Sequence, residues 1–398
     1  QKRVAQRAAG RCRAMLRRGA PRGLKARIGS VGRPLLIRSY AASSGTTEEP
    51  VDASRSTGFN SRISRVVESF QAPIEKMVLK VPASTANLGP GFDSMGFALD
   101  VWNRVVVQRS DKFSMTISGE GADRIELTED NLVARMTKKA LESLGQPMPT
   151  LHFDCYNAVP PTRGMGSSSA ALVAGLAAGL AFGGKDLTSP ATKKLLLQLA
   201  ANEEGHADNV APAIYGGFQI AICNEGNWIT QRVSIPDGLQ CVLFIPDDEM
   251  PTSEARACLP ELIPRKDAIF NISRAAMLVN CFATSQFDPL RMAMEDALHQ
   301  PYRTHMFPFE PIIKDALEAG AHGAFLSGAG PTVLAITGGV GIGDVGSDTM
   351  SQFLAEVVSE AMVRSARERG ISGTAHIATP SLTGVVSTAI DSKGELLW

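Results

Sequence analysis

The sequence predicts an α+β protein with two domains. Its 398 residues are enough for two domains of ordinary size, each with its own core. Hydrophobic residues make up 44% of the chain and charged residues 20%, which is a globular composition. Strand patterns and helical patterns follow one another without the regular strand–helix repeat of a parallel sheet. We therefore expect an N-terminal domain over residues 75–235 and a C-terminal domain over residues 236–398.

The charge of the chain is distributed unevenly. Residues 1–40 hold twelve Lys and Arg and no acid, so the remaining 28 basic and 40 acidic residues give the rest of the chain a net charge of −12. This acidity argues against a nucleic-acid surface. The basic opening, rich in Ala and Ser, is typical of an organellar transit peptide over residues 1–43. A basic tail that binds RNA or acidic lipid is the competing interpretation, and it would leave the protein cytoplasmic.

The end of this basic segment resembles a mitochondrial processing site, at Arg38-Ser39-Tyr40, with the plastid stroma as the alternative destination. Residues 44–74 are polar and irregular and predict a linker. The longest apolar stretch, residues 170–184, is short and rich in Ala and Gly, so we expect a buried helix there and no membrane span. Six dispersed cysteines without a C-x-x-C pair indicate a reducing compartment and no structural zinc.

In the N-terminal domain, alternating apolar residues predict the strands and 3.6-residue periodicity predicts the helices. The expected strands are 77–84, 103–110, 113–120, 151–160 and 216–224. The expected helices are 131–145, 170–184 and 192–205.

The C-terminal domain shows the same two patterns, with more helix. The expected strands are 240–246, 321–327, 332–337 and 373–379. The expected helices lie around 267–284, 289–299, 310–319 and 351–369.

The segment 160–171, PPTRGMGSSSAA, predicts an anion-binding loop that runs into a helix. Glycines let the backbone approach a ligand closely. The first turn of the helix leaves N–H groups without partners and carries a partial positive charge, which suits nucleotide phosphates. A serine cap on a buried helix is the alternative, but a cap requires one serine and this loop has three. The loop is not a Walker motif, and no protein-kinase motif occurs in the chain.

Two further segments end a predicted strand in a glycine-rich turn. They are 82–93, PASTANLGPGFD, and 326–332, LSGAGPT. Either segment alone would indicate only a tight turn. Together with the serine loop, and in this order, they resemble the three motifs of the GHMP kinases over about residues 76–385.

The first motif is most similar to the homoserine kinase branch of that family. The same branch is indicated by 204–213, EGHADNVAPA, by 252–256, TSEAR, and by 299–303, HQPYR. The resemblance implies an S5-like N-terminal domain and a ferredoxin-like C-terminal domain. It also implies transfer of the γ-phosphoryl group of ATP to the hydroxyl of L-homoserine, with Mg²⁺ as cofactor, and a homodimer.

The resemblance also assigns roles to residues. Glu204 is expected to hold Mg²⁺ with Ser168, although a solvated charge at a helix end is the alternative for Glu204. Arg256 and Arg303 match a clamp for the carboxylate of the substrate, and Asp93 matches a site for its ammonium group. The expected ATP-binding residues are Pro161, Arg163, Gly164, Met165, Gly166, Ser167, Ser168, Ser169 and Ala170. For Arg163, a side chain that faces solvent is the alternative to one that reaches phosphate. The third motif, near the phosphates, contributes Ser327, Gly328, Ala329 and Gly330. The expected substrate-binding residues are Asn87, Asp93, Asn209, Thr252, Arg256 and Arg303.

The expected catalytic residues are Asn209, Glu204 and Asp208. Many GHMP kinases place an aspartate as general base where this chain has Asn209, and an amide cannot take a proton. We therefore expect catalysis by alignment and electrostatics, without a strong side-chain base. Asp208 is the candidate exception, or it braces the adjacent turn.

Two other functions fit the same fold. One is another GHMP small-molecule kinase, such as mevalonate kinase, which the paired arginines disfavour. The other is a non-catalytic ligand sensor, which the intact serine loop and Glu204 disfavour.

Overall fold

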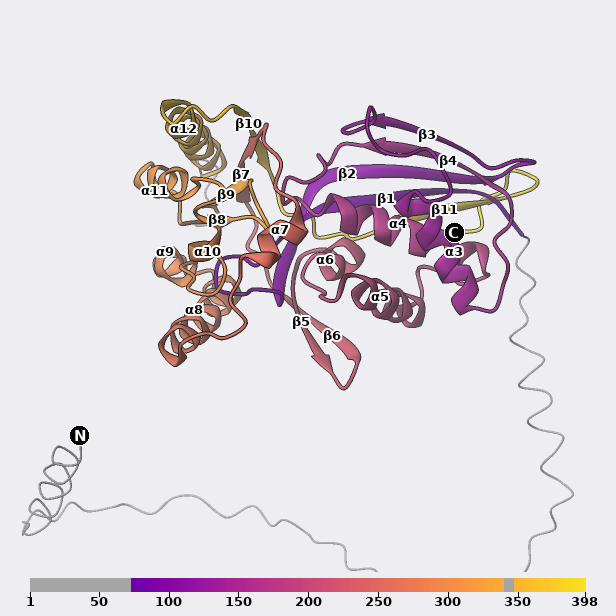
Figure 1. The fold of residues 1–398 in the computed structure, drawn as a ribbon, viewed down its shortest axis with the longest axis horizontal. Helices are drawn as coiled ribbons and strands as arrows, with labels where there is room; N and C mark the ends of the chain where they lie inside the picture. The colour runs from indigo at the N-terminus through magenta and orange to yellow at the C-terminus, as the bar shows by residue number, and fades with distance from the viewer. Residues whose placement is uncertain (1–72, 340–346) are drawn as a thin grey trace, which may run out of the picture. The chain divides into compact units, whose positions relative to one another are not determined.

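The computed structural model describes residues 73–339 and 347–398 of the chain (Figure 1). The predicted transit peptide, residues 1–43, and the predicted linker through residue 72 lie outside the described residues. The first strand, β1 (Ile74–Ala86), begins one residue before the expected start of the N-terminal domain. No helix in the described part of the chain is long and apolar enough to cross a membrane.

Seven strands form the first sheet. β1 pairs on one side with β2 (Met95–Arg109) and on the other with β11 (Val386–Asp391). Beyond β2 come β4 (Leu151–Asn157) and then β3 (Ser114–Gly119), which run parallel to each other. The hairpin of β5 (Phe218–Asn224) and β6 (Asn227–Val233) pairs with the start of β2.

Helices of the N-terminal domain gather on one side of this sheet in Figure 1. They are α3 (Leu132–Ser143), α4 (Ser167–Phe182), α5 (Pro190–Glu204) and α6 (Val210–Tyr215). The central helix, α4, is buried on nearly all sides, as its Ala-rich sequence predicts. A Cβ added at Gly175 would lie 2.4 Å from the carbonyl oxygen of Val133, so only glycine permits this close packing of α4 on α3.

The second sheet has the order β10-β7-β9-β8. Its strands are β7 (Leu239–Pro246), β8 (Gly323–Leu326), β9 (Val333–Gly338) and β10 (Gly373–Ala378). Because side chains alternate along a strand, β7 contributes to two cores. Val242 and Phe244 pack in the core that includes α11 (Glu310–Glu318) and α12 (Ser347–Glu368), whereas Cys241 and Leu243 pack in the core that includes α8 (Arg265–Thr284).

The α+β prediction is confirmed, with two differences in its parts. The last strand of the expected C-terminal domain, 236–398, belongs to the first sheet, because β11 pairs with β1. The expected helix 289–299 is wrong: α9 (Leu290–Ala293) and α10 (Gln300–Arg303) are separate short helices. The carboxylate of Asp296 separates them, since it accepts hydrogen bonds from the backbone N–H groups of residues 298–300.

Candidate functional site

The three glycine-rich segments meet at one cleft of about 660 Å³. The hydroxyl of Ser327, in the third segment, donates to the carbonyl oxygen of Gly164 in the serine loop at 2.6 Å. The same hydroxyl lies 2.8 Å from that of Thr85 in the first segment. Segments far apart in sequence are thus joined by short hydrogen bonds, and the cleft lies beside this junction.

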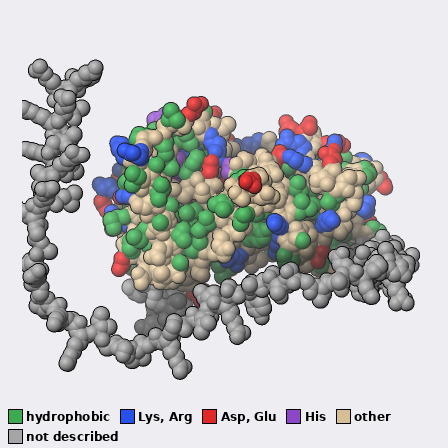
Figure 2. Space-filling view, turned by 90° about the horizontal axis from the view of Figure 1, so that it is seen from below, with side chains coloured by type: hydrophobic (Ala, Val, Ile, Leu, Met, Phe, Trp, Pro, Cys, Tyr) green, Lys and Arg blue, Asp and Glu red, His purple; other side chains and the backbone are tan. Residues whose placement is uncertain are grey.

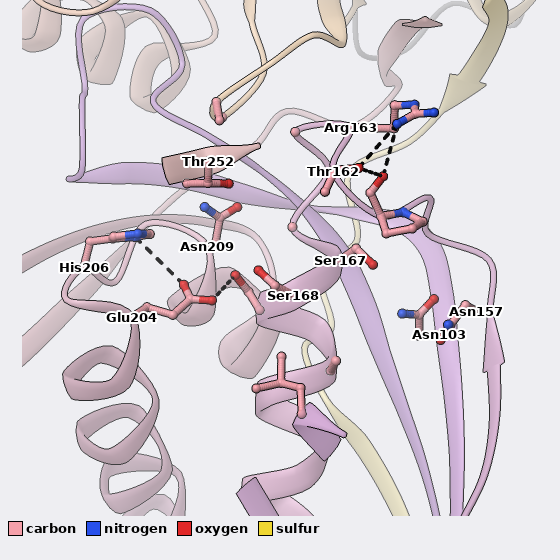
Figure 3. A pocket seen from close by; sticks show the side chains of 18 of the residues that line it. Asn103, Asn157, Thr162, Arg163, Ser167, Ser168, Glu204, His206, Asn209 and Thr252 are labelled. Atoms are coloured by element: carbon pink, nitrogen blue, oxygen red, sulfur yellow. Dashed lines mark hydrogen bonds and ion pairs between the residues drawn. The ribbon is translucent and has the colours of Figure 1, made fainter. Parts of the chain in front are cut away.

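The serine loop directs the start of α4 toward the cleft (Figure 3). Gly166 precedes the helix in the left-handed conformation, with φ 67°, and a Cβ there would lie 2.1 Å from the hydroxyl of Ser84. Among the described residues, no side chain caps this helix. Its first N–H groups are therefore free to bind an anion, and Ser167 and Ser168 add hydroxyls to the same wall.

Glu204 ends α5 beside the start of α4. One carboxylate oxygen accepts from the hydroxyl of Ser169 at 2.5 Å. The other, Oε2, is buried and has no hydrogen-bond partner among the described residues. Burial raises the pKa of Glu204 to about 7, although the nearby His206 and the Ser169 hydroxyl act in the opposite direction. A buried carboxylate oxygen without a donor can serve as a ligand for a cation.

His206 and Asp208 form a second polar unit next to Glu204. The Nδ1 atom of His206 lies 2.6 Å from Asp208 Oδ1 and 3.9 Å from Glu204 Oε2. Burial lowers the pKa of His206, but its hydrogen bond to Asp208 and the charges of Asp208 and Glu204 leave that pKa raised. Asp208 is 2% exposed and also lies near the amide of Asn209. The carboxylate of Asp208 thus braces this turn.

Arg256 lies in α7 (Thr252–Ala257) and forms a two-point ion pair with Asp93. Its Nη1 and Nη2 donate to the two carboxylate oxygens at 3.1 and 2.6 Å. This hydrogen bonding raises the pKa of Arg256. Asp93 in turn follows Asn87, whose side-chain oxygen accepts from the Asp93 backbone N–H at 3.1 Å. The predicted carboxylate and ammonium sites for a zwitterion are therefore adjacent and bound to each other.

Arg303 is buried, with 1% of its surface exposed. Its Nε donates to the carbonyl oxygen of Ala255, and its Nη1 donates to His299 Nδ1 and to the carbonyl oxygen of Gly328, each at 3.0 Å. Among the described residues, Nη2 has no acceptor. The protein therefore holds this guanidinium rigidly and leaves one of its nitrogens for a ligand.

His299 was not among the predicted site residues. Its Nε2 lies 2.8 Å from the carbonyl oxygen of Gly89 and must donate, because a carbonyl oxygen only accepts. Its Nδ1 accepts from Arg303, so the ring is neutral. Burial lowers the pKa of His299 more than the charge of Asp296 raises it, which agrees with the neutral ring. The HQPYR segment thus supplies both the arginine and its support four residues earlier.

Two groups could hold a cation. Asp93, His206 and Asp208 bring potential ligand atoms within 4.8 Å of one another. These atoms already have partners, since Asp93 binds Arg256 and His206 binds Asp208. Glu204 Oε2 has none, and Ser168 is exposed to the cleft. Glu204 with Ser168 therefore fits a cation better.

The far end of the cleft is more apolar and was not predicted. It lies between β3, β4 and the start of α3, and is lined by Ile117, Ile125, Leu132 and Cys155. Asn157 also lines it, and Asn103 uses its side-chain oxygen to accept from the N–H groups of residues 158 and 159. These residues carry no motif, so only the fold shows that they share a wall.

Most predicted site residues line this cleft. They are Asn87, Asp93, Pro161, Arg163, Gly164, Gly166, Ser167, Ser168, Ser169, Glu204, Asp208, Asn209, Thr252, Arg256, Arg303, Gly328 and Ala329. The structure does not bring Met165, Ala170, Ser327 and Gly330 to its wall. The side chains of Met165 and Ala170 are buried in the hydrophobic cores, and that of Ser327 is used in hydrogen bonds within the protein.

Arg163 lines the cleft, but its guanidinium is bound elsewhere. It donates to the carbonyl oxygens of Pro246 and Asp247 at 2.9 and 2.5 Å and lies 3.2 Å from Glu249 Oε1. Figure 3 shows it directed away from Ser167 and Ser168. Neither of the two expectations for this side chain, phosphate or solvent, describes its position, because it fastens the serine loop to the end of β7.

Comparisons with known proteins match this chain to one family. The model "GHMP kinases N terminal domain" matches residues 131–217, and "GHMP kinases C terminal" matches residues 279–344. The homoserine kinase of Desulfitobacterium hafniense is 38% identical over 300 residues, which cover 75% of this chain and 95% of the relative. That of Gloeobacter violaceus is 42% identical over 266 residues, covering 66% of this chain and 87% of the relative.

A solved structure has the same fold. The crystal structure of homoserine kinase from Cytophaga hutchinsonii superimposes with a TM-score of 0.68 at 27% identity. The match covers 80% of this chain and 99% of that one. The predicted GHMP fold class is thereby confirmed.

Proposed function

The chain belongs to the homoserine kinase family of the GHMP kinases, and from this premise we propose that it transfers the γ-phosphoryl group of ATP to the hydroxyl of L-homoserine, giving O-phospho-L-homoserine for threonine biosynthesis. One observation carries the proposal. A single cleft has an uncapped helix start at its centre, an apolar pocket at one end and two arginines with a carboxylate at the other. These features match a triphosphate, a base and an amino acid.

The start of α4 supports the nucleotide part of the proposal. Its free N–H groups and the hydroxyls of Ser167 and Ser168 suit the phosphate oxygens of ATP. The apolar end of the cleft suits the adenine base, which needs a flat slot and few polar contacts. Phosphoryl transfer depends mainly on positioning and charge neutralisation, and both reactants fit in one cleft.

The other end supports the amino-acid part. Arg303 offers Nη2 to a carboxylate, and Arg256 offers the same fork that it now gives to Asp93. A zwitterion can replace this internal pair, since its carboxylate satisfies the arginines and its ammonium satisfies Asp93. The substrate hydroxyl then lies toward Asn209, which shares the cleft wall with Glu204.

Mg²⁺ fits Glu204 and Ser168. Glu204 Oε2 is buried without a donor, and magnesium prefers hard oxygen ligands with few protein carboxylates. When bound, the ion would supply neutralisation of the phosphate charge. The residues themselves place the carboxylate, since Ser169 fixes the other oxygen of Glu204.

The side chains near the reacting hydroxyl support transfer without a strong base. Asn209 accepts a hydrogen bond from the hydroxyl of Ser84 at 3.0 Å and has no proton-accepting nitrogen. The Asp208 carboxylate is already bound to His206. We therefore assign Asn209 and Asp208 to alignment of the acceptor.

A coupled ADP-release assay with a panel of alcohols tests the proposal. We expect magnesium-dependent ADP release with ATP and L-homoserine, and phosphohomoserine as the product by mass spectrometry. Turnover with mevalonate in place of homoserine would contradict the substrate assignment. ATP binding without turnover of any alcohol would instead favour a ligand sensor.

For residues 1–43 we propose an organellar targeting role, with the mitochondrion favoured over the plastid by composition. Imaging a fusion of residues 1–75 to a fluorescent protein tests it. A diffuse cytoplasmic signal would contradict targeting. The homodimer stays a proposal, and light scattering of the purified chain measures its mass.

A further inference from the structure

Glu249 lies between two arginines that come from different walls of the cleft. Its Oε1 contacts Nη1 of Arg124, in the turn that follows β3, and lies 3.2 Å from Nη1 of Arg163, in the serine loop. Ile125, next to Arg124, lines the apolar end of the cleft, and Thr252, three residues after Glu249, lines the amino-acid end. One carboxylate therefore connects segments from the base end, the phosphate loop and the substrate end.

An exposed ion pair alone would indicate no function. On the face shown in Figure 2, basic and acidic side chains are interspersed, and pairs between such exposed groups contribute little to stability. Arg163 differs from these residues because its side chain is only 12% exposed and its other donors are bound. Its Nε donates to the carbonyl oxygen of Pro246 and its Nη2 to that of Asp247, at 2.9 and 2.5 Å. The guanidinium is thus fixed along the segment that leads to Glu249.

The backbone beside Arg163 is held by the same segment. Thr162 adopts the left-handed conformation, with φ 55°, which a β-branched residue rarely does. Its carbonyl oxygen accepts from the backbone N–H of Met250 at 3.1 Å, and the side chain of Met250 is buried in the core that includes α11 and α12. Unfavourable backbone conformations persist where the surrounding contacts determine them, and they are concentrated at functional sites. Residues 162 and 163 are therefore fixed in place by residues 246–250.

The segment that holds Arg163 leads directly into the substrate end of the cleft. Only residues 247–251 lie between β7 and α7, and α7 carries Arg256. The serine loop, in turn, leads into α4, whose free N–H groups suit the phosphates. The contacts of Arg163 thus set the distance between the phosphoryl donor and the acceptor. Phosphoryl transfer is sensitive to this distance, since a displacement of about 1 Å can reduce a rate by about 100-fold.

We infer that Arg163 and Glu249 are positioning residues, which hold the serine loop and α7 at the distance that phosphoryl transfer requires. Neither touches the reacting atoms. The guanidinium of Arg163 points away from Ser167 and Ser168 in Figure 3, and Glu249 is not among the described residues that line the cleft. This inference rests on the proposed kinase function, and it extends the site to Glu249, which lies outside all of the motifs.

Loss of this alignment has a chemical signature. In the proposed reaction, the bond between the γ-phosphorus and the β–γ bridging oxygen breaks and ADP leaves. A new bond forms to the hydroxyl oxygen of homoserine, whose proton is released to solvent. When the acceptor is displaced, a water molecule can take its place, and the products are then ADP, inorganic phosphate and a proton. We therefore expect misaligned variants to release more ADP than phosphohomoserine.

Glu249→Gln and Arg163→Lys test the inference in the coupled ADP-release assay, with phosphohomoserine measured by mass spectrometry. Glu249→Gln keeps the shape of the side chain without its charge, and we expect the turnover number to fall by about tenfold. Arg163→Lys keeps the charge but lacks the fork that holds two carbonyl oxygens, so we expect a fall of about 100-fold. The Michaelis constants for ATP and homoserine should stay within about twofold, because the groups that bind each reactant are unchanged. The ratio of ADP to phosphohomoserine should rise above one in both variants.

The control is Glu318→Gln, which breaks an exposed ion pair with Lys314 within α11, outside the cleft, and should leave the turnover number and the product ratio unchanged. Calorimetric titration with a non-hydrolysable ATP analogue gives the fraction of each protein that binds nucleotide. A turnover number that falls only in proportion to this fraction would show a purely structural role and overturn the inference. Unchanged turnover in both variants, or a rise in a Michaelis constant without a fall in turnover, would overturn it too.

A double variant tests whether the two residues act together. Because Arg163→Lys already disturbs the contact with Glu249, adding Glu249→Gln should lower the turnover number by less than about twofold. A fall equal to the product of the two single effects would indicate independent roles and overturn the joint assignment. A wild type that turns over no alcohol would contradict the proposed function as well, whereas an active wild type with unaffected variants overturns this inference alone.

Discussion

Replacing Arg256 by Leu tests the substrate end of the cleft most directly. Hydrogen bonds to charged groups contribute about 1.5–3 kcal/mol each when they are lost. Arg256 already binds Asp93 in the free protein, and its side chain is 37% exposed, so the net loss lies toward the lower end. We expect about 2 kcal/mol, which corresponds to a rise of about 30-fold in the Michaelis constant for homoserine.

The turnover number should change less than the Michaelis constant, because the carboxylate binds equally in the ground state and in the transition state. The assay is coupled ADP release with homoserine varied at saturating ATP. Arg369→Leu is the matched control, since Arg369 is a 34% exposed arginine near the carboxylate of Asp315 and does not line the cleft.

An unchanged Michaelis constant for homoserine in a folded Arg256→Leu variant would refute the carboxylate clamp. So would an equal rise for ATP and homoserine, which would indicate a general distortion of the cleft. A rise in the Arg369→Leu control would show that the loss of any surface arginine has this effect.

Three further predictions concern Glu204 and His299, which lie beside the cleft. Glu204→Gln keeps the shape of the side chain but removes its negative charge, so turnover should fall by about 100-fold or more while the protein stays folded. A normal rate in the coupled ADP-release assay would refute the assignment of Glu204 as a cation ligand. Folding raises the pKa of Glu204 from 4.5 to about 7, so its stabilising contribution is complete below pH 4.5 and is lost as the pH rises through 7. The measurement is the free energy of unfolding from urea titrations in the presence of a chelator. Between about pH 5 and about pH 8, this free energy should fall by about 2–3 kcal/mol more in the wild type than in Glu204→Gln. Parallel curves of unfolding free energy against pH for the two proteins would contradict the raised pKa. His299→Leu removes one hydrogen-bond partner from Arg303 Nη1 and one from the carbonyl oxygen of Gly89. We therefore expect a loss of about 2–4 kcal/mol in unfolding free energy and a higher Michaelis constant for homoserine. The control is His322→Leu, which changes a histidine outside the cleft and should leave this Michaelis constant unchanged.

The sequence predicted the phosphate loop and its two companion segments because each is a local motif. Glycines and serines at fixed spacing specify a turn and a helix start without reference to distant residues. The prediction that these segments belong to one site is consistent with the hydrogen bonds that join Ser327 to Gly164 and Thr85.

The remaining features depend on distant contacts. Nothing near Val386 indicates that β11 pairs with β1, because its partners lie at the other end of the described chain. The helix predicted over 289–299 was wrong because the capping effect of Asp296 outweighed an apolar pattern. The apolar end of the cleft combines Ile117 and Cys155 with residues of α3, and none of them belongs to a motif.

The pairing of β11 with β1 has a consequence for synthesis of the chain on the ribosome. The ribosome makes β1 long before its neighbour on one side, residues 386–391. Until then the first sheet has an open edge beside β1, which can pair with other chains. The first sheet is therefore complete only after residues 386–391 have left the ribosome, and a nonsense codon before residue 386 would expose that edge permanently.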